Sequence, residues 1–102
     1  MKQSQIVVSE EAKSDIDNLF DFIVTEYKSE LTANRYINGL ENRIYSLSRS
    51  AEIYQIQTSP YFTKFGDNIR RINYKKMAII YSIYGHYVYI HKIVASSLIP
   101  EI

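Results

Sequence analysis

Residues 68–94 have the sequence NIRRINYKKMAIIYSIYGHYVYIHKIV, which carries the strongest structural signal in the chain. Val, Ile and Tyr dominate this stretch and no proline interrupts it, a composition that favours β-strands. It predicts three consecutive strands at about 69–75, 77–84 and 87–94. A two-residue hairpin turn is expected between the last two strands, at Gly85 and His86.

Two amphipathic helices are predicted before these strands, after a short β-branched strand at Gln5–Val8. Ser9 and Ser29 are typical N-cap residues, each placed just before an apolar pattern with helical spacing. The short join at 28–30 predicts an antiparallel helical hairpin. The expected apolar faces are Ala12, Ile16, Leu19, Phe20, Ile23, Val24 and Tyr27 in the first helix, and Ala33, Tyr36, Ile37, Leu40, Ile44 and Leu47 in the second.

The predicted order is β-α-α-β-β-β, an α+β fold in a single domain over residues 1–102. We expect the helical hairpin to pack on one face of a small antiparallel sheet, because its apolar stripes have no other surface large enough to cover them. The opposite face should then stay partly open. Residues 51–67 are irregular, and we expect Tyr61, Phe62 and Phe65 to fold back onto the core.

The composition narrows the class of protein. With no cysteine there is neither a disulfide framework nor a thiolate metal site. The N-terminus lacks the long apolar segment of a signal peptide, and no apolar run is long enough to span a bilayer. We therefore expect a cytoplasmic protein that is not associated with a membrane. The sequence also lacks a metal-ligand pattern, a phosphate-binding loop and a serine nucleophile motif, so we expect no metal and no cofactor.

The positive charge is unevenly distributed. The net charge is only +1, yet five of the six cations in residues 51–102 lie between Lys64 and Lys76. Such a cluster suits either a solvated strand edge or a surface for an acidic partner. Arg70 and Arg71 should point to opposite faces of their strand, and a turn lysine reaches a polyanion easily. The candidates for binding a target or nucleic acid are Lys64, Arg70, Arg71, Lys75, Lys76 and Lys92.

Histidine and tyrosine are the remaining groups that could carry chemistry. His86 falls in a turn, and His91 lies within a strand with no neighbouring carboxylate to orient it as a base. A lone strand histidine is more often packed than catalytic. Ten tyrosines are many for this length. They suit a half-buried sheet surface, with a stacking platform for bases as the alternative.

Three segments carry a family resemblance: VSEEAKSDI at 8–16, IRRINYKKMAIIY at 69–81 and VYIHKIV at 88–94. With the order of elements, they resemble the RelE/ParE superfamily of toxins from bacterial type II toxin–antitoxin systems, over about residues 5–95. The resemblance implies one of two mechanisms. RelE-like members are metal-independent endonucleases that cut mRNA on the ribosome with Arg, Lys and a Tyr or His, whereas ParE-like members, known as plasmid stabilisation proteins, poison DNA gyrase.

Matched position by position, this chain departs from the nuclease pattern. The arginine expected three residues before the strand tyrosine falls at Ala78, and the segment after the last strand, 94–98, has no charge. Arg71 matches a basic strand position and Tyr81 matches the strand tyrosine, whose expected role is packing. One cation is too few to stabilise a pentavalent phosphate. We therefore hypothesise that nuclease activity is weak or absent.

The expected protein is a ParE-like growth-inhibiting toxin with a cognate antitoxin and, as target, DNA gyrase or else the ribosome and its mRNA. Two alternatives stay open. One is a ribosome-dependent mRNA endonuclease, and the other is a non-toxic binding module with the same fold. Whether the chain forms a homodimer is also open. The candidate catalytic residues of the endonuclease are Arg71, Lys75, Lys76 and His91.

Overall fold

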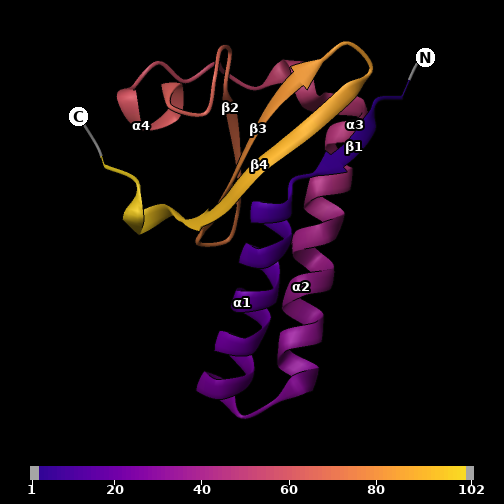
Figure 1. The fold of residues 1–102 in the computed structure, drawn as a ribbon. Coiled ribbons are helices and arrows are strands. Elements are labelled where there is room, and N and C mark those ends of the chain that lie inside the picture. Colours follow the sequence, from indigo (N-terminus) through magenta and orange to yellow (C-terminus); the bar gives the residue numbers. More distant parts are fainter. Residues whose placement is uncertain (1–2, 101–102) are drawn as a thin grey trace.

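The computed structural model describes residues 3–100 and has the predicted α+β architecture, with a two-helix hairpin packed on one face of a four-stranded sheet (Figure 1). Two 3-10 turns, at Ala51–Ile53 and Ser96–Leu98, join the regular elements. In chain order the helices and strands are β1 (Gln5–Val8), α1 (Glu10–Tyr27), α2 (Glu30–Tyr45), α3 (Leu47–Ser50), α4 (Pro60–Thr63), β2 (Arg70–Tyr74), β3 (Met77–Tyr84) and β4 (Tyr87–Ala95).

Both long helices begin at the serines that the sequence indicates. The Ser9 hydroxyl accepts a hydrogen bond from the Ala12 N–H, and the Ser29 hydroxyl accepts one from the Thr32 N–H. Each bond satisfies a backbone donor in the first helical turn that has no partner within the helix. Helix α1 ends at Lys28, whose left-handed conformation (φ 51°) turns the chain toward α2.

The three C-terminal strands confirm the predicted meander, with bounds within one residue of those expected at each end. The sheet order is β1-β4-β3-β2, and β2, β3 and β4 are antiparallel to their neighbours. Strand β1 differs from the expected antiparallel arrangement, because it pairs parallel with β4 and makes the sheet mixed. A parallel pair needs a long crossover connection, and the whole hairpin and the strands β2 and β3 lie between β1 and β4.

One residue of β4 interrupts the ladder with β3. Ile80 is opposite Lys92 whereas Tyr81 is opposite Ile90, so His91 is the extra residue of a β-bulge. The bulge changes the alternation of side chains along β4. As a result Ile90 and Ile93, three positions apart, both belong to the core under the helices.

The main core lies between the hairpin and the sheet. Helix residues such as Leu40 and Ile44 pack there against Ile79, Val88 and Ile90 of the strands. The face of the sheet opposite the helices, called here the second face, is less open than the sequence suggests. A flap of residues 59–69 that includes α4 covers part of it. The buried residues of this smaller cluster are Phe62, Ile69, Ala78, Ile80 and Ile99, with Tyr61, Phe65 and Val94 packed beside them.

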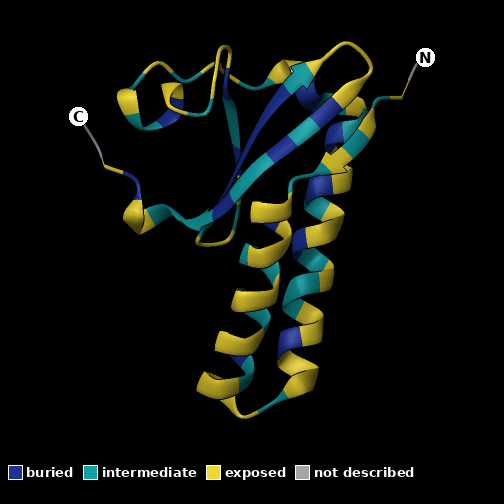
Figure 2. Cartoon of the chain, in the orientation of Figure 1, coloured by how far each residue is buried: buried dark blue, intermediate teal, exposed yellow. Residues whose placement is uncertain are grey.

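Large exposed side chains occur both on the hairpin and on the sheet. The hairpin projects well past the sheet, and its outer turns are largely exposed (Figure 2). On the second face, Tyr84 and Tyr87 flank the β3–β4 turn and are about half exposed. The flap residue Gly66 lies close to the Tyr84 hydroxyl.

Candidate functional site

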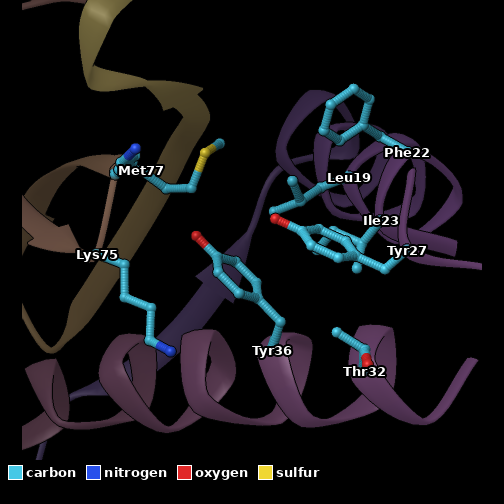
Figure 3. Close-up of a pocket in the computed structure, with 9 residues that line it drawn as sticks. Leu19, Phe22, Ile23, Tyr27, Thr32, Tyr36, Lys75 and Met77 are labelled. Carbon is cyan, nitrogen blue, oxygen red and sulfur yellow. The ribbon is translucent and has the colours of Figure 1, made fainter. Parts of the chain in front are cut away.

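A groove of about 530 Å³ separates the far half of the helical hairpin from the turn between β2 and β3. Figure 3 shows that side chains from α1, α2 and the strand turn all point into this space, which we call the hairpin groove. Its lining is mainly apolar and aromatic, with two lysines on the turn. The lining residues are Leu19, Phe22, Ile23, Tyr27, Thr32, Tyr36, Lys75, Lys76 and Met77.

Helix α1 contributes a wall of the groove whose apolar and aromatic side chains include strongly exposed ones. Phe22 is 59% exposed and Tyr27 is 67% exposed, although both are large and apolar or aromatic. Contiguous apolar surface of this kind on a small protein marks a site of interaction with another molecule. The sequence pattern assigned Phe22 to neither helix face. Its position outside the predicted apolar stripe was the available signal for this groove.

Tyr36 and Lys75 lie on the opposite wall, and Tyr74 supports them from behind. Tyr36 of α2 packs edge-to-face on Tyr74 of β2, with ring centroids 5.2 Å apart. The Lys75 ammonium lies 5.5 Å from the Tyr36 centroid and 5.6 Å from the Tyr74 centroid. Partial burial, and to a smaller extent the neighbouring Tyr74, raise the pKa of the Tyr36 hydroxyl. This wall therefore presents a fixed positive charge beside aromatic surface.

The backbone at the groove is already hydrogen bonded. Met77, at the start of β3, pairs with Tyr74 on one side and Ala95 on the other. The Lys76 carbonyl accepts a hydrogen bond from the Ser96 N–H. A partner in the groove therefore finds side chains rather than a strand edge that it could extend.

Three of the candidate cations form hydrogen bonds within the protein, namely Arg70, Arg71 and Lys92. Arg70 donates from Nη1 to the backbone carbonyls of Glu52 and Tyr54, at 2.9 and 2.6 Å. It thereby fixes the loop that follows α3 beside β2. Arg70 and Arg71 point to opposite faces, as predicted: the Arg71 guanidinium lies 6.0 Å from the Phe62 ring under the flap.

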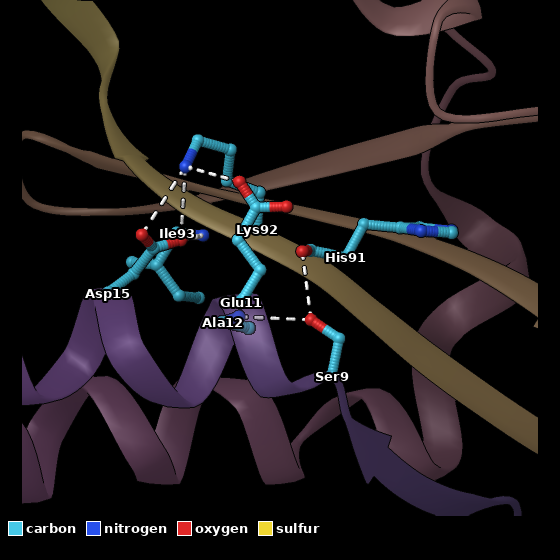
Figure 4. A network of polar contacts seen from close by, with 7 residues as sticks. All are labelled: Ser9, Glu11, Ala12, Asp15, His91, Lys92 and Ile93. Carbon is cyan, nitrogen blue, oxygen red and sulfur yellow. Dashed lines mark hydrogen bonds and ion pairs between the residues drawn. The ribbon is translucent and has the colours of Figure 1, made fainter.

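Lys92 of β4 forms ion pairs with two carboxylates of α1 (Figure 4). Its ammonium lies 3.1 Å from a Glu11 carboxylate oxygen and 3.3 Å from one of Asp15, and Asp15 also accepts the Ile93 N–H at 3.0 Å. Partial burial by itself lowers the pKa of Lys92, but the hydrogen bond to Glu11 and the charge and bond of Asp15 outweigh it and raise the pKa. Lys92 thus acts as a structural tie between helix and strand.

His91 lies on the second face and contacts aromatic residues. Its Nε2 is 2.7 Å from the hydroxyl of the buried Ser82, and its ring centroid lies 4.8 Å from Tyr89 and 5.9 Å from Phe65. Burial lowers the pKa of His91. Its backbone carbonyl accepts a hydrogen bond from the Ser9 hydroxyl (Figure 4). The imidazole is thus packed between aromatic rings and hydrogen bonded to Ser82.

The four candidate catalytic residues fall into two separate groups. Arg71 and His91 share the second face, but β3 lies between their strands, which puts their backbones about 10 Å apart. Lys75 and Lys76 lie at the strand turn, beside the hairpin groove. A phosphoryl-transfer site needs its cations and its acid–base group around one reacting atom.

Two further properties concern the described residues 3–100. Among them, no three His, Asp or Glu side chains gather in a group that could hold a metal ion. Over the same range, no helix combines the length and apolar character that crossing a bilayer requires.

Comparisons with known proteins agree on the type of fold. The family model for the ParE toxin of type II toxin–antitoxin systems (parDE) matches residues 6–97. A solved chain described as the chromosomal ParDE TA system from P. aeruginosa superposes with a TM-score of 0.75 at 14% identity, covering 91% of this chain and 96% of that one. A comparison with curated protein sequences finds no match. Because the family model spans most of the chain, this protein belongs to the ParE toxin family of type II toxin–antitoxin systems.

Proposed function

We propose that this protein is a toxin that stops bacterial growth by binding DNA gyrase, and that a cognate antitoxin neutralises it. The observation that carries the proposal is the family match over residues 6–97. The physical features of the surface are consistent with a protein that works by binding. It has an apolar groove between the hairpin and the strand turn, and its candidate catalytic groups do not converge.

We assign the antitoxin to the hairpin groove. The groove combines exposed apolar side chains, such as Phe22 and Tyr27, with Lys75 and Lys76 on its rim. Within residues 3–100, neither lysine forms an ion pair. A segment with an apolar stripe flanked by carboxylates would complement both features.

The antitoxin segment should bind there as a helix. Peptides that bind as strands gain affinity from main-chain hydrogen bonds to an open sheet edge, whereas helices bind through side chains in a groove. The strand ends that line the hairpin groove are already paired, at Met77 and Lys76. A helix can use the groove without an open edge.

Gyrase is favoured over the ribosome as the target because the second face lacks a focused catalytic site. Arg71 is separated from His91 by a strand, and His91 is bonded to Ser82. Loss of one charge-stabilising donor typically slows such chemistry by about a hundredfold or more. A protein with this fold whose cations and acid–base group are not gathered at one point is better suited to blocking a partner than to cutting RNA.

Controlled induction of the toxin in a bacterial host tests the proposed target. DNA synthesis should stop before protein synthesis, and purified protein should inhibit supercoiling by gyrase in vitro. If protein synthesis stops first, with A-site cleavage that Arg71→Ala abolishes, the protein is an mRNA endonuclease and the proposal is wrong. If growth is unaffected, the protein is a binding module without toxicity.

The variant Phe22→Asp tests the antitoxin site. Placing a charge at the centre of the apolar wall should weaken antitoxin binding by about thirtyfold or more, as expected for an interface hot spot. Toxicity should persist, since the variant escapes neutralisation. Tyr45→Asp is the matched control, because Tyr45 is equally exposed on α2 but does not line the groove. Equal effects of both variants would place the antitoxin elsewhere.

A further inference from the structure

A chain of aromatic rings crosses the second face of the sheet, from the flap to the β3–β4 turn. We call it the aromatic track. Successive ring centroids lie 4.8 to 6.3 Å apart, so the rings form a continuous surface rather than isolated contacts. In spatial order the track consists of Tyr61, Phe65, His91, Tyr89 and Tyr84.

The track extends beyond what the core needs. The buried cluster under the flap is centred on Phe62 and Ile80, and the rings that pack against it are Tyr61 and Phe65. The far end of the track lies outside this cluster, with Tyr84 53% exposed and its cross-strand partner Tyr87 49% exposed. Burial alone therefore explains one end of the track and leaves the other end unexplained.

Two cations lie at the flap end of the track. The Lys64 ammonium is 4.1 Å from the Tyr61 ring centroid and 5.2 Å from that of Phe65. Arg71 uses its Nε to donate to the Asn73 side chain at 3.0 Å. Within the described part of the chain neither Lys64 nor Arg71 forms an ion pair.

We propose that the aromatic track binds a single strand of nucleic acid. Proteins that hold single strands combine cations for the phosphates with aromatic rings on which bases stack. Lys64 and Arg71 supply the charge, Tyr84 supplies exposed ring surface, and the half-buried Tyr89 lies next to it. Base edges are not read in such a site, so binding should depend little on sequence.

This inference goes beyond gyrase binding and requires no cleavage. It also does not depend on toxicity, because binding can be measured on the purified protein.

The His91 imidazole contributes ring surface, while its Nε2 remains bonded to Ser82. An acidic protein surface is the competing occupant for the same cations. It would use Lys64 and Arg71 without needing the tyrosine faces.

Fluorescence anisotropy with labelled oligothymidine and oligouridine tests the proposal. Both strands should bind at low salt, as expected for binding that does not read base edges. The Tyr84→Ala variant should weaken binding about tenfold, since one stacked base is lost. Lys64→Ala and Arg71→Ala should each lower the steepness of the salt dependence by about 0.7, the value for one phosphate contact on a single strand.

Two control variants distinguish binding by the aromatic track from non-specific binding by surface charge or exposed rings. Lys13→Ala removes an exposed cation on α1, and Tyr45→Ala removes an exposed ring on α2. Both should bind the oligonucleotides as the unmodified protein does. The proposal is overturned if neither strand binds, or if the controls weaken binding as much as the track variants. It is also overturned if polyglutamate binds equally well and Tyr84→Ala has no effect on the oligonucleotides.

Discussion

Tyr81 shows how one buried polar group supports the core. It is fully buried under the helices, and its hydroxyl donates a 2.7 Å hydrogen bond to the Ala51 carbonyl. This bond ties β3 to the turn that follows α3. Burial, partly offset by the nearby Arg70, raises the pKa of the Tyr81 hydroxyl to about 12.

Replacing Tyr81 by Phe should destabilise the fold by about 1–3 kcal/mol, because the Ala51 carbonyl loses its donor. The pH dependence follows from the raised pKa. The neutral tyrosine stabilises the folded state fully below its unfolded pKa of about 10, and this contribution is lost as the pH rises through about 12. Urea unfolding at neutral and alkaline pH should show this loss in the unmodified protein. Tyr81→Phe should lack it, and Tyr45→Phe should retain it.

His91 should make stability sensitive to acid. Burial lowers its pKa, so the folded state favours the neutral ring. The stabilisation is present above the unfolded pKa of about 6.5 and is lost as the pH falls through the lower pKa of the folded protein. His91→Gln can keep a hydrogen bond to Ser82 without titrating. The urea midpoint of this variant should therefore fall less between neutral and mildly acidic pH. If His86→Gln, in the exposed turn, reduced the pH dependence of the urea midpoint as much, the assignment to His91 would be wrong.

At the scale of elements, Gly39 allows α2 to approach β2 closely. A methyl group at this position would overlap the hydroxyl end of the Tyr74 ring, which lies against the helix. The same ring contacts Tyr36 and the Lys75 ammonium, two residues that line the hairpin groove, so it supports that wall of the groove. The contact between helix and strand therefore sets the shape of the groove.

Gly39→Ala should destabilise the protein by about 1 kcal/mol, although alanine is the better helix former. The cost comes from displacing Tyr74, so it should shrink or reverse in a Tyr74→Leu background. Asn34→Ala, at an exposed position of the same helix, should be neutral or slightly stabilising. Urea unfolding of the unmodified protein, of Gly39→Ala, of Tyr74→Leu and of the double variant measures the coupling between the two residues. Equal effects of Gly39→Ala in both backgrounds would show that Tyr74 is not the cause.

The two long helices and the four strands could be predicted from the sequence, because caps and apolar spacing are local signals, whereas α4 lies in the segment that was expected to be irregular. Ser9 and Ser29 mark the helix starts, and β-branched runs mark the strands. The pairing of β1 with β4 could not be predicted, since four residues carry no register information. The bulge at His91 left a trace, the three-residue spacing of Ile90 and Ile93, which strict alternation does not produce.

The candidate site was harder to predict than the fold. Charge counting singled out six cations, but Arg70 and Lys92 form tertiary bonds that no local pattern encodes. The hairpin groove depends on where the helices end relative to the sheet. That relation is set by packing over the whole chain, so only single exposed residues such as Phe22 hint at it.

For the whole molecule, the decisive feature is that a long hairpin lies on a small sheet. The 18 residues of α1 span about 27 Å, so its far end passes the β2–β3 turn (Figure 1). The hairpin groove forms where this overhang faces the turn. The aromatic track lies on the opposite side of the sheet, so the two surfaces can be altered independently.

Reversing charge on the two sides should therefore affect antitoxin binding differently. Lys75→Glu with Lys76→Glu, on the groove rim, should weaken antitoxin binding about tenfold, chiefly through slower association, and this effect should fade at high salt. Toxicity should remain. Lys64→Glu with Arg71→Glu, on the second face, should leave antitoxin binding unchanged, because neither residue lines the groove. Growth assays and antitoxin titration of both double variants supply the comparison. If both pairs weakened antitoxin binding equally in folded proteins, the effect would not be specific to the groove, and the assignment of the antitoxin to the hairpin groove would fail.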